Sequence, residues 1–162
     1  MKKLFAIAIL GSVVLVSCKK SSGGGAPLQA TINGKATSFG TEASGLTSSG
    51  GGQYTIVVAG VSGTTSPNAF SVTVESSSPI VAGTYTDTST TNFGGLQYIP
   101  YNTTNFFASA GQASHPTKVV VTSVSSTQIS GTFQGTLYAG QDTTTTPETI
   151  TNGSFNVKLT AQ

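Results

Sequence analysis

The amino-acid sequence predicts an all-β protein, folded as a single antiparallel β-sandwich or flattened β-barrel of roughly 8–10 strands. Three features of the 162 residues support this class. Apolar and polar side chains alternate with period two over several segments, Gly, Asn and Ser clusters separate those segments, and no window has helical periodicity. Helix-forming residues are scarce, whereas 27 Thr and 20 Ser follow residue 17, and the β-branched Thr suits a half-exposed pleated surface.

Three segments alternate most clearly and are predicted to be strands: residues 69–77, 128–139 and 154–160. Over most of their length, every second residue is apolar or glycine, which places those residues on one face of a strand and polar side chains on the other. A face of this kind packs on a core. The residues predicted to face the core are Phe70, Val72, Val74, Ile129, Gly131, Phe133, Gly135, Leu137, Phe155, Val157 and Leu159.

Two further segments, residues 54–61 and 118–124, are apolar on both faces. This pattern predicts central strands that are covered on both sides. Weaker strand candidates have shorter patterns of apolar and β-branched residues. They are residues 28–32, 35–39, 82–86, 96–101 and 105–110.

Turn-forming residues divide the candidate strands. Asn33-Gly34 lies between two of them and predicts a two-residue type I′ hairpin. Asn152-Gly153 predicts either a second hairpin or a β-bulge. Loops are expected where Gly, Ser, Thr, Asn and Pro cluster, at residues 47–53, 62–68, 75–79, 86–92 and 142–147.

The first 18 residues have the features of a bacterial lipoprotein precursor. A basic start precedes an uncharged run at residues 4–16, which is shorter than the roughly 20 residues needed to cross a bilayer. A run of this length fits the core of a signal peptide. The sequence Leu-Val-Ser-Cys at residues 15–18 resembles a lipobox, so we expect cleavage after residue 17 and acylation of Cys18. The alternatives are an ordinary secretory signal with an incidental cysteine and a lone buried thiol.

These features divide the chain into three parts: a signal peptide at residues 1–17, an acylated cysteine with a flexible Gly/Ser tether at 18–27, and an antiparallel β-domain at 28–162. Without Lys2 and Lys3, five lysines balance five acidic residues, and the chain has no arginine. Proteins that bind nucleic acid need a basic surface to neutralise phosphates. Nucleic acid is therefore excluded as a partner.

Several motifs carry a family resemblance. They are the lipobox, ATINGK at residues 30–35, AGTYT at 82–86, ISGTFQGTL at 129–137 and ITNGSFNVKL at 150–159. With these motifs the chain resembles small lipoproteins of Bacteroidota that belong to a domain-of-unknown-function family. The resemblance covers nearly all of the chain after the cysteine and implies an extracytoplasmic β-domain. It implies no activity and no catalytic residues.

The sequence offers little catalytic or metal-binding chemistry. A serine-hydrolase triad would pair the one histidine, His115, with Asp87 or Asp142, but no G-x-S-x-G motif is present. We therefore expect His115 to be a solvated loop residue. The acidic residues are scattered singly, and no zinc or calcium motif occurs, so we expect no catalytic residue, no metal and no cofactor. The enzymatic alternative is glycoside hydrolysis by two carboxylates that folding brings together.

One segment is rich in aromatic residues and is a candidate for contact with a glycan or a protein partner. Aromatic rings can stack on sugar rings, while neighbouring Asn and Gln side chains hydrogen-bond hydroxyl groups. The alternative is that these rings fill the core or cover an edge strand. Pro100 favours a position at an edge or in a loop. The candidate residues are Phe93, Tyr98, Tyr101, Phe106 and Phe107.

A second candidate is a modification site. Asp142-Thr143-Thr144 resembles the acceptor sequence for O-glycosylation in bacteria of this kind, and it lies in a predicted loop. The resemblance implies Thr143 as the modified residue.

Together these observations predict a non-enzymatic, lipid-anchored protein of the cell envelope, most readily of the outer membrane. Its β-domain would act as a binding or structural module for a glycan or an envelope protein. The alternatives are an accessory subunit of an outer-membrane complex, a lipocalin-like carrier, and a carboxylate-dependent hydrolase of envelope glycans. Whether the domain faces the periplasm or the cell surface is left open by the sequence.

Overall fold

The computed structural model describes residues 26–103 and 105–161, so the predicted signal peptide, Cys18 and most of the tether lie outside the described residues. Eleven β-strands and no helix occur within these ranges, which confirms the predicted all-β class. The described part of the chain accordingly contains no helix that could span a membrane. The strands are β1 (Leu28–Ile32), β2 (Lys35–Ser38), β3 (Thr41–Gly50), β4 (Gln53–Ser62), β5 (Asn68–Ser76), β6 (Gly83–Thr86), β7 (Asn92–Ile99), β8 (Phe107–Ala108), β9 (Lys118–Val124), β10 (Gln128–Ala139) and β11 (Glu148–Ala161).

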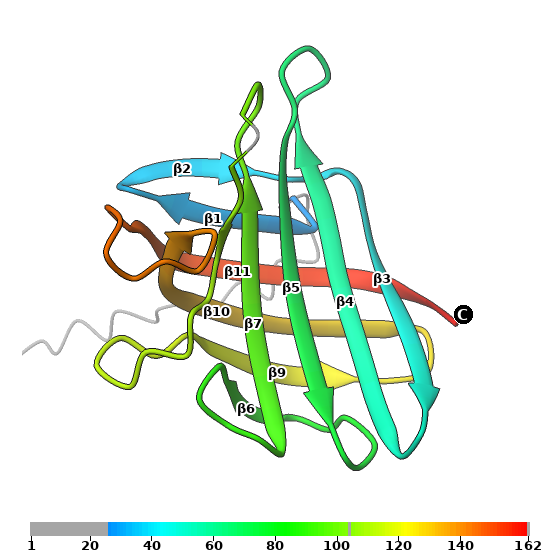
Figure 1. Cartoon of the computed structure of the whole chain (residues 1–162). Coiled ribbons are helices and arrows are strands. Elements are labelled where there is room, and N and C mark those ends of the chain that lie inside the picture. The colour runs from blue at the N-terminus through cyan, green and yellow to red at the C-terminus, as the bar shows by residue number, and fades with distance from the viewer. Residues whose placement is uncertain (1–25, 104, 162) are drawn as a thin grey trace, which may run out of the picture.

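Hydrogen bonds join these strands into one sheet, in the order β2-β1-β11-β3-β4-β5-β7-β6-β9-β10-β8. Additional pairings of β11 with β10 and of β7 with β8 connect distant parts of this order, so the ladder closes on itself. In Figure 1, β3, β4, β5 and β7 stand side by side in one layer, with β4 and β7 pointing up and β3 and β5 pointing down, and β1, β2, β9, β10 and β11 cross behind them at a steep angle. The result is a flattened, barrel-like fold of two layers. Parallel pairing of β11 with β3 and of β6 with β7 makes the sheet mixed rather than purely antiparallel.

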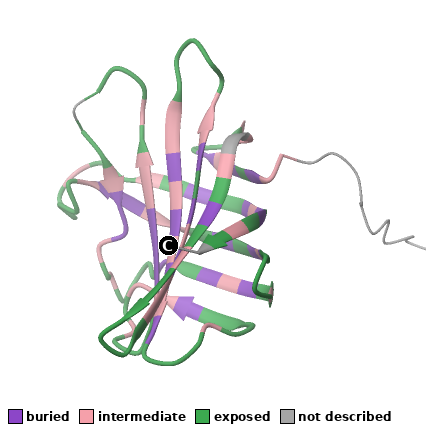
Figure 2. Ribbon diagram, turned by 90° about the vertical axis from the view of Figure 1, so that its right-hand side faces the viewer, coloured by how far each residue is buried: buried purple, intermediate pink, exposed green. Residues whose placement is uncertain are grey.

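The core lies between the two layers and is built from the predicted faces. Nearly all the predicted core residues on β5, β10 and β11 are buried, the exceptions being the partly exposed Gly135 and Leu159. Figure 2 shows how buried residues alternate with exposed ones along the strands. On β4 and β9, however, Val57 and Val120 are half-buried and Ala59 is exposed. The prediction that both faces of these strands are covered is wrong, because the outer side of each layer faces solvent.

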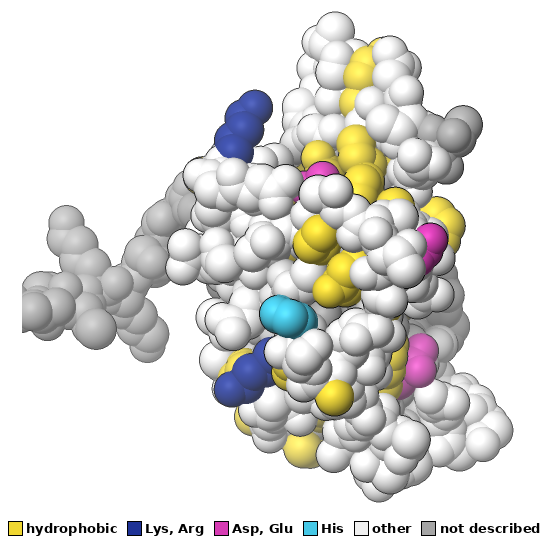
Figure 3. Space-filling view, turned by 60° about the vertical axis from the view of Figure 1, so that its left-hand side comes forward, with side chains coloured by type: hydrophobic (Ala, Val, Ile, Leu, Met, Phe, Trp, Pro, Cys, Tyr) yellow, Lys and Arg dark blue, Asp and Glu magenta, His cyan; other side chains and the backbone are white. Residues whose placement is uncertain are grey.

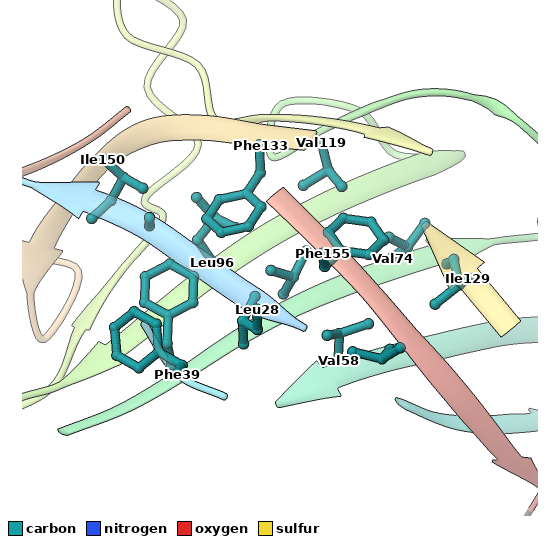
Figure 4. Packing of buried hydrophobic residues seen from close by; sticks show 14 of the residues in the cluster. Leu28, Phe39, Val58, Val74, Leu96, Val119, Ile129, Phe133, Ile150 and Phe155 are labelled. Carbon is teal, nitrogen blue, oxygen red and sulfur yellow. The ribbon is translucent and has the colours of Figure 1, made fainter. Parts of the chain in front are cut away.

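Aromatic rings fill the middle of the core. The ring centroids of Phe39 and Phe70 lie 5.1 Å apart, those of Phe70 and Phe133 5.3 Å, and those of Phe133 and Phe155 6.3 Å. Figure 4 shows Phe39, Phe133 and Phe155 among aliphatic side chains from both layers. Offset ring pairs at these distances are stabilising. The space between the layers is therefore occupied by the protein's own side chains.

Two glycine–phenylalanine pairs join β10 to β11 beneath these rings. Gly131 pairs with Phe155, and Phe133 pairs with Gly153, in the antiparallel register. A Cβ atom on Gly131 would lie 2.5 Å from the Phe155 ring, and one on Gly153 would lie 2.6 Å from the Phe133 carbonyl oxygen. Each ring thus packs on a strand position that has no side chain. Two of the motifs named above, ISGTFQGTL and ITNGSFNVKL, form this packing unit.

Both residues of the first Asn-Gly pair, and Asn152 of the second, adopt the left-handed backbone that Asn and Gly tolerate best. Asn33 (φ 48°) and Gly34 (φ 80°) join β1 to β2 as the predicted two-residue hairpin. Asn152 (φ 51°) lies within β11, where the register with β10 shifts between Gly153 and Ile150. Of the two predicted alternatives, the second Asn-Gly pair therefore marks a bulge and not a hairpin.

The strand β3 is absent from the sequence-based prediction. The predicted loop at residues 47–53 overlaps its second half, and the turn to β4 is confined to Gly51 and Gly52. Two other segments change in length: β7 begins at Asn92, earlier than predicted, and β8 is shorter than predicted. These differences matter for the candidate site, because β7 carries two of its aromatic residues.

Ser109 extends the sheet where β8 ends. Its backbone N–H donates to the Leu96 carbonyl oxygen (3.0 Å), and its hydroxyl accepts a hydrogen bond from the Leu96 N–H (2.9 Å). The same hydroxyl shares a hydrogen bond of 2.9 Å with the hydroxyl of Thr117, which is fully buried. Every buried side-chain N or O atom in the described residues has a partner. Ser109 therefore closes a gap between the layers with polar contacts.

Candidate functional site

The structure divides the predicted aromatic segment into three parts. Tyr98 and Phe107 form a register pair between β7 and β8, with ring centroids 6.4 Å apart. Both side chains are partly buried and pack against the hydrophobic core. The Tyr98 ring also lies 6.4 Å from that of Phe39 and 6.3 Å from that of Phe70. Tyr98 and Phe107 therefore continue the internal ring stack towards one end of the fold.

Tyr101 and Phe106 lie in the loop between β7 and β8 and remain exposed, at 44% and 39%. The loop is attached at both ends: the Tyr101 N–H donates to Asn68 Oδ1 (2.8 Å), and the Phe106 carbonyl accepts from the Gly140 N–H (2.9 Å). We call Tyr98, Tyr101, Phe106 and Phe107 the aromatic end. Figure 3, viewed from the side of the β1–β2 turn, shows a column of hydrophobic side chains with an acidic side chain among them.

A carboxylate that sequence reasoning missed belongs to the same end. Asn33 Nδ2 donates to Glu148 Oε2 (2.6 Å), and Asn33 Oδ1 accepts from the Thr149 N–H (2.8 Å), so the β1–β2 turn holds Glu148 in place. Burial raises the pKa of the Tyr98 hydroxyl, and the negative charge of Glu148 raises it further. The aromatic end thus combines rings with an oriented hydrogen-bond acceptor. No sequence signal links residues 33 and 148, since only the pairing of β1 with β11 brings them together.

Phe93 is separate from the other four aromatic residues. It pairs with Glu75 of β5 on the outer face of the front layer, whereas Tyr98 faces the core. A Cβ atom on Gly95 would lie 2.8 Å from the tip of the Phe93 ring, so the ring lies over Gly95. Phe93 therefore contributes to a different surface from the aromatic end.

The carboxylates whose side chains are described have separate structural partners. His115 is exposed, with Nδ1 3.0 Å from Ser114 Oγ, and makes no hydrogen bond to an aspartate within the described residues. Nor do the described residues contain a cluster of three or more His, Cys, Asp or Glu side chains that could hold a metal ion. The hydrogen bonds to carboxylates come from Gln53 to Glu75, from Gly111 and Thr117 to Asp87, from Thr144 to Asp142, and from Asn33 to Glu148.

The candidate modification site Thr143 is exposed in the loop between β10 and β11. Asp142 Oδ1 accepts hydrogen bonds from the N–H (3.0 Å) and the hydroxyl (2.7 Å) of Thr144, and both bonds lower the pKa of Asp142. The Thr145 hydroxyl donates to the Asp142 carbonyl oxygen (2.7 Å). Within the described residues the Thr143 hydroxyl makes no hydrogen bond. It is thus an accessible hydroxyl in a locally ordered loop.

No protein-family model, curated protein or solved structure matches this chain. What the domain does is therefore inferred from its own residues.

Proposed function

We propose that this protein is a lipid-anchored, non-enzymatic binding module of the cell envelope. Acylated Cys18 holds it at the outer membrane, the Gly/Ser tether spaces the domain from the lipid, and the aromatic end contacts an envelope glycan or protein. The lipobox, the charge balance and the resemblance to small Bacteroidota lipoproteins support this proposal. Anchoring raises the local concentration of the domain, so a contact surface of modest affinity suffices.

The observation that carries the proposal is the exposure of Tyr101 and Phe106 in the loop that joins β7 to β8, the two strands that hold the partly buried Tyr98 and Phe107. Binding surfaces depend on a few aromatic anchors, which lose little conformational entropy when they are already held in place. Here the backbone of Tyr101 is hydrogen-bonded to the first residue of β5, and that of Phe106 to the loop after β10. Glu148 adds an acceptor whose position Asn33 fixes. The aromatic end therefore offers exposed aromatic rings on a hydrogen-bonded backbone, beside a carboxylate whose orientation is fixed.

The anchor is tested by membrane fractionation and by metabolic labelling with an alkyne analogue of palmitate. We expect the wild-type protein to be labelled and to sediment with membranes. Cys18→Ala should lose the label and leave the membrane fraction. If Cys18→Ala remains labelled and membrane-bound, the anchoring part of the proposal is wrong.

The contact surface is tested with detergent-solubilised full-length protein and two probes that detergent does not dissolve, purified peptidoglycan sacculi and outer-membrane proteins immobilised on beads. We expect co-sedimentation with one probe, and at least about tenfold weaker binding for the double variant Tyr101→Ala/Phe106→Ala, since central aromatic residues each contribute more than about 1 kcal/mol. Val81→Ala is the matched control, because Val81 is a hydrophobic residue exposed at 61% outside the aromatic end. Equal binding by the double variant and the control would refute a role for the aromatic end.

A further inference from the structure

The outer face of the front layer carries a second surface of interest, where Phe93 and Glu75 lie side by side. The two residues are register partners on β7 and β5. Together with the β3–β4 turn and the loop before β7, they line a hollow of about 340 Å³. A hollow of this size lies within the range that small molecules occupy in proteins.

The walls of the hollow are held in place by the protein's own hydrogen bonds. Gln53 Nε2 donates to Glu75 Oε2 (3.1 Å), which orients the carboxylate. On the opposite wall, Ser89 Oγ accepts from the Asn92 N–H (3.0 Å), and the buried Ser76 hydroxyl donates to Asn92 Oδ1 (3.1 Å). These contacts fix the loop before β7. A ligand would therefore meet a preorganised surface, which lowers the entropic cost of binding.

The residues that line the hollow differ in chemistry. Phe93 lines the hollow as its aromatic residue and is partly exposed, and the tip of its ring extends over Gly95. Ser77, Thr90 and Thr91 at the rim are exposed, and within the described residues their hydroxyls make no hydrogen bond. Hydroxyl groups both donate and accept, whereas a carboxylate only accepts. One flat apolar surface thus lies among many uncharged hydrogen-bonding groups.

We propose that this hollow binds a neutral pyranose sugar, with the apolar face of the sugar on Phe93 and a sugar hydroxyl donating to Glu75. Glu75 is the one charged residue that lines the hollow, so an anionic ligand would be repelled. Hard metal ions require several oxygen ligands, and cage-like recognition of an organic cation requires several aromatic walls. A sugar matches one ring, one carboxylate and a hydroxyl-rich rim. This goes beyond the function proposed above, because the hollow is separate from the aromatic end.

The experiment is saturation-transfer NMR on detergent-solubilised full-length protein. The probes are the methyl glycosides of glucose, galactose, mannose and N-acetylglucosamine. We expect transfer to the ring protons of at least one of them. Phe93→Leu keeps an apolar cover over Gly95 but removes the flat ring, and Glu75→Gln removes the charge while keeping the shape. Each should weaken binding about tenfold, as expected for loss of one strong contact.

Ser71→Ala is the matched control, since Ser71 lies on the same outer face of β5 but outside the hollow. It should bind the sugar as the wild type does, and so should Tyr101→Ala/Phe106→Ala, which tests the aromatic end alone. The proposal is overturned if no glycoside shows transfer or if Phe93→Leu binds as well as the control. Stronger binding of tetramethylammonium than of any glycoside would also overturn it, because the hollow would then be a cation site.

Discussion

Replacing Gly153 by alanine tests the packing unit that joins β10 to β11. The new Cβ atom would lie 2.6 Å from the Phe133 carbonyl oxygen and closer still to two atoms of the Phe133 ring. The ring cannot swing away, because its centroid lies 5.3 Å from that of Phe70 and 6.3 Å from that of Phe155. The carbonyl belongs to the paired strand. The clash must therefore be relieved by moving the backbone.

Two opposing effects set the expected size of the change. Overpacking a well-packed core costs about 1–3 kcal/mol. Any Gly→Ala change also restricts the unfolded chain, which stabilises the folded state by about 0.4–1 kcal/mol. Gly50→Ala isolates this second effect, because Gly50 is also in a strand, has an ordinary φ, and has no atom within 4 Å of its built Cβ position. The difference between the two variants therefore measures the steric cost alone, about 1–3 kcal/mol.

The assay is urea unfolding of both variants, monitored by tyrosine fluorescence. We expect equal m-values, a lower midpoint for Gly153→Ala, and a midpoint for Gly50→Ala at or slightly above that of the wild type. In thermal unfolding, the melting temperature of Gly153→Ala should lie about 3 °C or more below that of Gly50→Ala. Free energies of unfolding that agree within about 0.5 kcal/mol for the two variants would refute the reasoning, since surface substitutions alone vary by that much.

Three further predictions concern the polar network, the aromatic end and the candidate modification. Ser109→Ala should destabilise the domain by about 1–3 kcal/mol, because the Leu96 N–H loses its acceptor. Hydrogen exchange of the Leu96 amide should then become faster. An exchange rate as slow as in the wild type would contradict this prediction. Since the pKa of Tyr98 is raised in the folded state, stability should fall as pH rises from the ordinary tyrosine pKa through the raised value. Tyr98→Phe should make the loss of stability at alkaline pH smaller, as measured by urea unfolding at a series of pH values. A pH dependence equal to that of the wild type would rule out this role of Tyr98. Intact-mass spectrometry should show a hexose-scale addition that Thr143→Ala removes; an unmodified wild-type mass would exclude the site.

The alternating strands could be predicted from sequence because their burial follows side-chain period alone. β3 could not, since its Gly- and Ser-rich sequence has no apolar alternation. Its place in the sheet comes from pairing with β4 and from Gly45, where a Cβ atom would lie 2.6 Å from the Leu159 side chain. Strands of this kind are specified by their neighbours, which a single sequence does not display.

The candidate site was predictable in part for a similar reason. Proximity in sequence grouped five rings, of which Tyr98 and Phe107 pack together. Phe93 and Tyr98 are an odd number of residues apart, so one strand directs them to opposite faces. The placement of Phe93 and Tyr98 on opposite faces could be predicted from the alternation of side chains along a strand, once both residues were assigned to the same strand. The contribution of Asn33 and Glu148 was not readable, because it depends on the pairing of β1 with β11 across more than a hundred residues.

The position of β11 in the sheet has a consequence for how the chain reaches its fold. This strand pairs with β1, β3 and β10, which makes it the seam at which the ladder closes. Contacts between strands so distant in sequence slow folding, since a long loop must close before they form. While the chain is still being synthesised and β11 has not yet been made, the strand edges that pair with it have no partner. The ladder therefore cannot close until all the other described strands have been made, and until then the sheet stays open along the edges of β1, β3 and β10 that β11 later covers.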